Sequence, residues 1–277
     1  MIKTSTIILV SAFLLIISCS KEIKKETILS EKKLELQVVE TYKEGIKALD
    51  EGDVLFAAKK FNEVELMFPQ SDLAPKSAIM AAYAYYSQDY YFDSIAELIR
   101  FIRVYPNYKN IDYVYYLLAI NYYEQIVDEK KDLNSIIKAK ESFEFLANKY
   151  PDTDYALDAN FKLDLINEIL ASKEMYIAGY YFDKKKWIPA INRYKTVVKD
   201  YDTTIFVEEA LHRLVEIHYI IGLRNEAYKY ASLLGYNYES SKWYENSYKI
   251  FNSDYKKKII TEKKNNIVIK KIKSLFE

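Results

Sequence analysis

The amino-acid sequence predicts an all-α protein. Only 5 Gly and 5 Pro occur in 277 residues, too few for the many tight turns of an all-β chain. Half of the residues are hydrophobic, which is ample for a continuous core. A third observation, a recurring pattern of small and large residues between positions 57 and 202, predicts how the helices are arranged.

The pattern is a small residue, a large apolar residue four positions later and a chain-turning residue eight further on. Its four copies are Ala57/Phe61/Pro69, Ser94/Leu98/Pro106, Ala139/Phe143/Pro151 and Ala190/Tyr194/Asp202. The small residues let two antiparallel helices approach closely, the large residue fills the space between them, and proline stops the second helix. This is the spacing of the tetratricopeptide repeat, whose period is about 34 residues. Such units bury their apolar faces by stacking, so we expect a solenoid of about five helix-turn-helix repeats.

The repeats are irregular at two places. Ala139 follows Ala119 by 20 positions, where the other repeats have 12, so we expect eight inserted residues within positions 128–135. Residues 154–178 contain neither Gly nor Pro, and this predicts a single long helix that continues into the fourth repeat. A weaker fifth repeat follows. We expect the repeat domain at residues 34–252 and a Lys-rich C-terminal tail at residues 253–277.

The N-terminus predicts the cellular compartment. A short positive region at Lys3 precedes an apolar run of about 11 residues, too short to span a bilayer and right for a signal peptide at residues 1–18. The segment that ends at Cys19 resembles a bacterial lipobox, so we expect lipidation of Cys19, followed by a flexible tether at residues 19–33. Ser20 after the cysteine favours the outer membrane by the usual sorting logic. A plain secretory signal or an anchor with a chance cysteine is the alternative.

The sequence predicts no catalytic, metal or cofactor site. His212 and His218 are six positions apart, which does not bring them to one helical face, and no second cysteine supplies metal-ligand spacing. We therefore expect both to be partly buried structural histidines. None of the five glycines forms a phosphate loop or a nucleophile elbow. The net charge is zero, so no basic field argues for nucleic acid.

The repeat register also predicts a binding groove. The second, fifth, ninth and twelfth residues of each first helix are expected to face the concave side of the solenoid. Tyrosine at such positions offers a large contact area and a hydroxyl for peptide groups, so we expect an extended or helical apolar peptide to bind there. The alternative is that packing against neighbouring helices buries these rings. The candidate groove residues are Tyr42, Ile46, Ile79, Tyr83, Tyr86, Tyr113, Tyr116 and Tyr123.

Several longer segments carry a resemblance to a known family. They are Phe68-Pro-Gln-Ser, Ala82-Tyr-Ala-Tyr-Tyr, the run at 101–116 that contains Asn110-Ile-Asp-Tyr-Val, Ala139-Lys-Glu-Ser-Phe, Tyr150-Pro-Asp-Thr and the run at 180–194. In these segments the sequence resembles the BamD (ComL) family, tetratricopeptide lipoproteins of the outer-membrane β-barrel assembly machinery. Asp202 departs from the pattern, because the family usually has proline there.

The resemblance implies a non-enzymatic periplasmic scaffold in the assembly of outer-membrane β-barrel proteins. It implies as partners a BamA-like Omp85 barrel protein, docked on the C-terminal repeats, other Bam lipoproteins, unfolded outer-membrane proteins, and the membrane through the lipid anchor. Three cations that we expect to be exposed on the fourth and fifth repeats, Arg193, Lys199 and Arg213, suit an acidic partner surface. A pilotin-type lipoprotein for secretin or pilus assembly is the alternative function, and an envelope-coordinating repeat protein is a further one.

Overall fold

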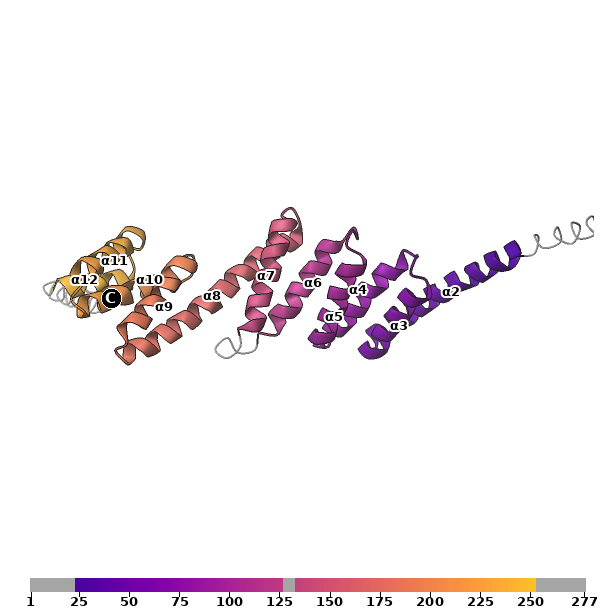
Figure 1. The fold of residues 1–277 in the computed structure, drawn as a ribbon, viewed down its shortest axis with the longest axis horizontal. Coiled ribbons are helices and arrows are strands. Elements are labelled where there is room, and N and C mark those ends of the chain that lie inside the picture. The colour runs from indigo at the N-terminus through magenta and orange to yellow at the C-terminus, as the bar shows by residue number, and fades with distance from the viewer. Residues whose placement is uncertain (1–22, 127–132, 253–277) are drawn as a thin grey trace, which may run out of the picture. The chain divides into compact units, whose positions relative to one another are not determined.

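The structure, a computed structural model, describes residues 23–126 and 133–252, and all of its regular elements there are helices (Figure 1). The all-α prediction is confirmed. The predicted signal peptide, Cys19, the C-terminal tail and most of the predicted insertion lie outside the described residues. The helices are α2 (Ile23–Asp50), α3 (Val54–Met67), α4 (Leu73–Tyr86), α5 (Tyr91–Val104), α6 (Ile111–Glu124), α7 (Asn134–Lys149), α8 (Asp154–Asp183), α9 (Trp187–Asp200), α10 (Val207–Ile220), α11 (Arg224–Asn237) and α12 (Lys242–Phe251).

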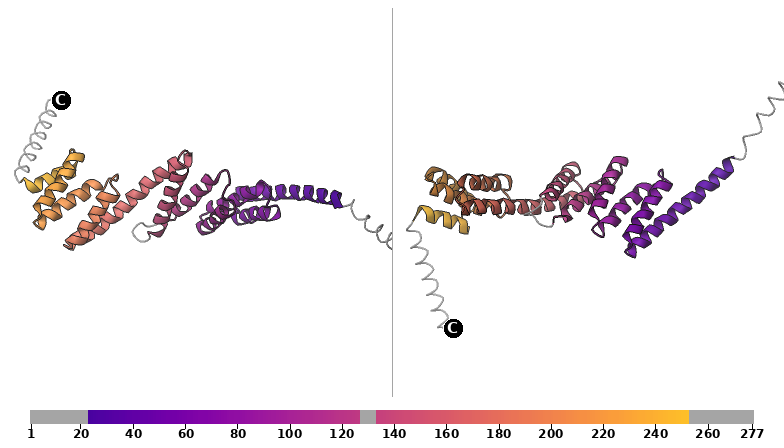
Figure 2. Two further views of the ribbon diagram at one scale, coloured as in Figure 1. Left: turned by 45° about the horizontal axis from the view of Figure 1, so that its top comes forward. Right: turned by 60° about the horizontal axis from the view of Figure 1, so that its bottom comes forward.

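The chain forms two compact units, residues 1–125 and 126–277. In the first unit, each helix from α2 to α6 packs against the next, and α4 also contacts α6. In the second unit, α7 to α11 pack in the same sequential way, and α12 contacts both α10 and α11. Figure 2 shows the same order within each unit from two further directions. Sequential packing of helix pairs is the arrangement that the repeat pattern predicts.

The turns inside four helix pairs have the same construction. Each contains one residue in the left-handed region, with φ of 84° at Gly52, 64° at Asp89, 55° at Lys185 and 85° at Gly222. The following amide donates a hydrogen bond to a carbonyl five residues back, as from Asp53 N to Ala48 O at 2.9 Å. This is the Schellman ending of a helix, in which a left-handed residue turns the chain back on itself. These turns lie between α2 and α3, α4 and α5, α8 and α9, and α10 and α11, so they mark four of the five repeats.

The recurring residues of the sequence pattern lie in the core. The small and large members of all four copies are at most 2% exposed. In the first copy, Ala57 and Phe61 pack with Ala81 and Ala84 of the next repeat's first helix. A Cβ at Gly45 would lie 2.8 Å from the Phe61 ring, so the absence of a side chain there lets α2 approach α3. The physical interpretation of the pattern is confirmed.

Helix α8 confirms the prediction of one long helix. It spans 30 residues and packs against both α7 and α9. Thr153 caps its start, because the threonine hydroxyl accepts a hydrogen bond from Ala156 N. Near its middle, Asn167 accepts a hydrogen bond from Lys140 of α7, whereas Glu174 pairs with Arg193 of α9. One continuous helix therefore serves two successive repeats.

Helix α2 begins earlier than the sequence pattern indicates. Residues 23–33, expected as part of a flexible tether, belong to α2. The segment contains neither Gly nor Pro and is rich in Lys and Glu, which are good helix formers, so a high charge density does not prevent helix formation. Within the described ranges, every helix is too short or too polar to cross a bilayer.

Candidate functional site

The eight predicted groove residues all lie in the first unit, on α2, α4 and α6. The structure divides them by exposure. Ile79 is 9% exposed and belongs to the core of α4. Tyr42 and Ile46 are half-buried against the core cluster around Phe61, and the Tyr42 ring meets the Phe61 ring edge-on with centroids 5.5 Å apart. For these three residues, packing between helices explains why the side chain is apolar or aromatic.

An aromatic cluster that remains accessible lies at the end of α4. Tyr83 is 38% exposed, and its ring centroid is 6.2 Å from that of Tyr86, which is 6.2 Å from that of Tyr91. The Tyr91 hydroxyl donates a 2.7 Å hydrogen bond to Asp89, and this bond raises the pKa of Tyr91 to about 12. Burial, followed by the nearby Glu124 carboxylate, raises the pKa of Tyr86. We call Tyr83, Tyr86 and Tyr91 the α4 tyrosine cluster.

Tyr91 was not predicted from the repeat register, because it is the first residue of α5 and not a groove position of a first helix. Its signal in the sequence is the run Asp89-Tyr-Tyr directly after α4, where a left-handed residue folds the chain back. The remaining predicted residues, Tyr113, Tyr116 and Tyr123, are half-buried along α6, which packs against α4 and α5.

A charged network on α3 and α5 was also missed. Arg100 donates to both oxygens of Glu65, at 2.9 and 2.7 Å, and to Glu97 at 2.8 Å. The hydrogen bonds that Glu65 accepts raise the pKa of the Arg100 guanidinium, so this group stays charged. Burial and then the Glu65 hydrogen bond raise the pKa of Tyr105 to about 12. The network lines a hollow of about 480 Å³ together with Leu66.

The network could have been found only by aligning the repeats. Glu65 and Arg100 are 35 positions apart, close to one repeat period, so they fall on adjacent second helices. A bidentate arginine–carboxylate pair of this kind fixes the distance between two helices.

The three predicted partner-binding cations differ in their environments. Lys199 is 86% exposed, with Asp200 at the 4.0 Å limit of an ion pair. Arg193 is 44% exposed and contacts both oxygens of Glu174, at 2.9 and 3.0 Å. Arg213 is not exposed as expected: it lies half-buried between Glu209 and Glu216, over the rings of Phe182 and Trp243. Carboxylates one helical turn away on either side bind its guanidinium. A basic residue in the sequence is therefore not by itself evidence of a surface cation that is available to a partner.

The two histidines are structural, as predicted. His218 is 5% exposed, and its Nδ1 lies 2.7 Å from the Leu214 carbonyl oxygen. His212 Nδ1 lies 2.8 Å from Ser247 Oγ, and Nε2 lies 3.6 Å from Glu216. A serine, a histidine and a carboxylate in a row resemble a hydrolase triad, but Ser247 is fully buried and no substrate reaches it. The arrangement instead attaches α12 to α10.

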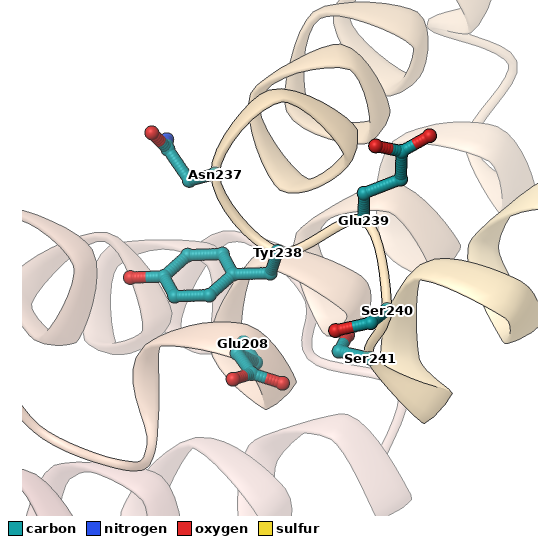
Figure 3. Close-up of a pocket in the computed structure, with 6 residues that line it drawn as sticks. All are labelled: Glu208, Asn237, Tyr238, Glu239, Ser240 and Ser241. Atoms are coloured by element: carbon teal, nitrogen blue, oxygen red, sulfur yellow. The ribbon is translucent and has the colours of Figure 1, made fainter.

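A polar pocket near the start of α12 gives no catalytic arrangement either. It has a volume of about 410 Å³ and is lined by Glu208 and residues 237–241 (Figure 3). The carboxylates of Glu208 and Glu239 point to different sides of it (Figure 3). The Ser241 hydroxyl already caps α12 by accepting a hydrogen bond from Tyr244 N at 3.0 Å. In the part of the chain that the structure describes, no group of three metal-ligating side chains occurs.

These observations define a class of protein: a helical-repeat protein that presents hollows and an aromatic cluster at its surface. Comparison with known proteins gives the family. The sequence profile of the YfiO outer membrane lipoprotein family matches residues 35–233, and the chain belongs to this family of outer membrane protein assembly factors, also called BamD. The family is non-enzymatic and consists of outer membrane lipoproteins.

Individual relatives agree with this assignment. The chain is 41% identical over 209 residues to the outer membrane protein assembly factor BamD of Rickettsia prowazekii, covering 76% of this chain and 83% of the relative. It is 37% identical over 236 residues to BamD of Caulobacter vibrioides, covering 85% and 76%. Among solved structures, the TPR2AB-domain:pHSP90 complex of yeast Sti1 is 14% identical with a TM-score of 0.42, covering 78% of this chain and 82% of that chain. The two BamD relatives agree with the assembly-factor interpretation and not with a pilotin.

Proposed function

We propose that this chain is a lipid-anchored scaffold of the Bam complex at the periplasmic face of the outer membrane. In this role it binds a BamA-like Omp85 barrel protein, other Bam lipoproteins and unfolded outer-membrane proteins. The single observation that carries the general role is 41% identity to a BamD assembly factor over most of both chains. The finer assignments to surfaces rest on the geometry of the two units.

The first unit suits recognition of an unfolded substrate. The α4 tyrosine cluster presents three adjacent rings, of which Tyr83 is 38% exposed. Tyrosine side chains give a large contact area at low entropic cost and carry a hydroxyl for peptide groups. An aromatic-rich segment of an unfolded barrel protein therefore fits this surface.

The second unit suits the folded partner. Arg193 and Lys199 lie on α9 with substantial exposure, and both can face an acidic surface. Arg213 is assigned a different role, because its two carboxylate partners lie within the chain. It positions α10, and its contribution to docking is indirect.

Co-purification of the full-length tagged protein with its membrane partners tests the proposal. Recovery of a BamA-like barrel protein is expected, and recovery of a secretin instead would support the pilotin alternative. Arg193→Glu combined with Lys199→Glu should reduce recovery of the barrel protein, because each reversal turns an attraction into a repulsion. Lys229→Glu, a reversal on the exposed face of α11, is the matched control.

Truncation after Ser253 separates the repeats from the tail. The proposal expects the truncated chain to retain its partner. Loss of the partner on truncation, together with its retention after both charge reversals on α9, would place the docking site in the tail and overturn the assignment.

A further inference from the structure

A groove runs along α8 in the second unit, on the side that faces the start of α10. It consists of two adjoining hollows of about 450 and 290 Å³, which share Ser172 and Phe206 as lining residues. The apolar part of its walls includes Met175 and Phe182 on α8 and the exposed Ile205 in the turn before α10. The groove is thus continuous over more than two turns of α8.

The floor of the groove contains a glycine that no internal contact explains. Ser172 and Gly179 are seven residues apart, so they lie on the same face of the helix. Gly179 has no positive φ, and a Cβ placed there would meet nothing within 4 Å. Glycine in a helix interior costs about 0.5–1 kcal/mol relative to alanine. Its effect here is to leave the groove open beneath an incoming side chain.

The charge of the groove is predominantly negative. Glu168, Asp183 and Glu209 line it, and Arg213 is the one basic side chain among its described lining residues. Arg213 is already bonded to Glu209 and to Glu216. The described lining residues therefore carry more carboxylate charge than basic charge.

The Glu168 carboxylate in this groove has one oxygen that lacks a hydrogen-bond partner among the described residues. Its Oε1 accepts a hydrogen bond from Ile205 N at 3.1 Å, but its Oε2 is buried and has no hydrogen-bond partner among the described residues. A buried acceptor without a donor costs about 1–3 kcal/mol, and more when it is charged. Because Glu168 lines the groove, its carboxylate is available to a donor that enters the groove.

We propose that this groove binds an apolar segment of a partner protein that carries a lysine or arginine, whose cation pairs with Glu168. Apolar flanks of the segment cover Ile205 and Phe206, and the bulk of a neighbouring side chain occupies the space above Gly179. The inference refines the docking surface of the proposed function and relies on it only for the identity of the partner. The groove selects a basic segment, whereas Arg193 and Lys199 select an acidic surface, so the two together fix the orientation of the partner.

Site-specific photocrosslinking in the full-length, membrane-anchored protein tests the occupant. A photoreactive phenylalanine analogue replaces Tyr176, which lines the groove and is 62% exposed, and in a control it replaces Tyr236, which is 89% exposed on α11. The expected adduct from position 176 maps to a partner segment with Lys or Arg adjacent to the crosslinked residue. An adduct with residues 253–277 of the same chain, with a second copy or with a segment that has no basic residue overturns the proposal, as does no adduct.

Two matched pairs of variants test the mechanism. Glu168→Gln keeps the size of the side chain and removes its charge, so it should reduce the crosslink yield from position 176 by about tenfold or more, as for other buried charge pairs. Asp164→Asn, one turn away on α8 and outside the groove lining, should leave the yield within about twofold.

Gly179→Leu should abolish the crosslink by filling the floor, and Gly179→Ala should preserve most of it. Equal yields across these folded variants would sink the proposal.

The outcome distinguishes this inference from the proposed function. If the barrel protein co-purifies but position 176 gives no adduct, the function stands and the groove assignment fails. If position 176 captures a basic segment of a different protein, dependent on Glu168, the groove assignment stands and the docking part of the proposed function fails.

Discussion

At the scale of single residues, the accessible tyrosines of α4 have the most direct functional consequence. Replacing Tyr83 and Tyr86 together by Ala should weaken binding of a peptide from the C-terminus of a barrel protein by about 1–3 kcal/mol, the range found when well-packed interface aromatics are truncated. Fluorescence anisotropy with the labelled peptide measures the change. Tyr236→Ala, at an exposed position on α11, is the control.

Circular dichroism must first show that the double variant is folded. An unchanged dissociation constant in a folded Tyr83→Ala/Tyr86→Ala variant would show that the substrate contacts another surface.

Tyr194 predicts a response to alkaline pH. It is 2% exposed, and burial raises its pKa to about 12. The folded protein therefore retains this proton between pH 10 and pH 12, whereas the unfolded chain loses it, so stability from Tyr194 is present below pH 10 and lost above it. Between pH 9 and pH 11, the unfolding free energy of the wild-type protein should fall by about 1 kcal/mol more than that of Tyr194→Phe. Guanidinium denaturation at both values measures this, and parallel losses would contradict it.

At the scale of elements, two helical glycines have opposite expected effects. Gly45→Ala brings a methyl group against the Phe61 ring, which lies 2.8 Å from the position of the new Cβ. Overpacking of this kind typically costs about 1–3 kcal/mol. Gly179→Ala meets no neighbouring atom, so it should stabilise the protein by about 0.5–1 kcal/mol through the helix propensity of alanine. Urea denaturation of both variants tests the contrast, and stabilisation by both would show that α2 and α3 do not require the close approach.

Helices and their core residues were predictable from the sequence because repeat packing is local. A small residue followed by a large residue four positions later is sufficient to place Ala57 and Phe61 between neighbouring helices. The absence of Gly and Pro over residues 154–178 predicted α8, since nothing there ends a helix. The start of α2 was missed because a charged segment can be either a solvated helix or a tether.

Details of the candidate site were less predictable because they depend on contacts between elements. Arg213 reads as a surface cation in the sequence, yet its guanidinium lies between Glu209 and Glu216 and over the Trp243 ring. The same holds for Ile79, which the repeat register assigns to the groove and which is 9% exposed. Periodicity determines the face of a helix, but the neighbouring helix determines whether that face is open.

At the scale of the whole molecule, membrane attachment is predicted from Cys19, which lies outside the described residues. Cys19→Ala should release the protein to the periplasm or leave it uncleaved at the inner membrane, because each buried CH₂ of an acyl chain contributes about 0.8 kcal/mol to anchoring. Membrane fractionation and mass spectrometry of the N-terminal peptide provide the measurement. If the variant remained in the outer membrane and the wild-type protein carried no fatty acid, attachment would depend on protein partners.

Because α8 contacts α7 near one end and α9 near the other, packing in the second unit depends on the angle between these two faces of the helix. Asn167 is bonded to α7, and Glu174 to α9, along one helix of about 45 Å. Inserting one alanine after Leu170 turns the later part of α8, together with α9 and α10, by about 100° relative to the earlier part. Contacts that cross this point, between Glu168 and Ile205 and between Lys140 and the Tyr201 ring, are then lost. Inserting four alanines adds about 400° and returns these faces to within about 40° of their starting direction. The four-residue insertion should thus unfold at a higher temperature than the one-residue insertion, despite its greater length. Changes in chain length inside α8 are then admissible only in whole turns.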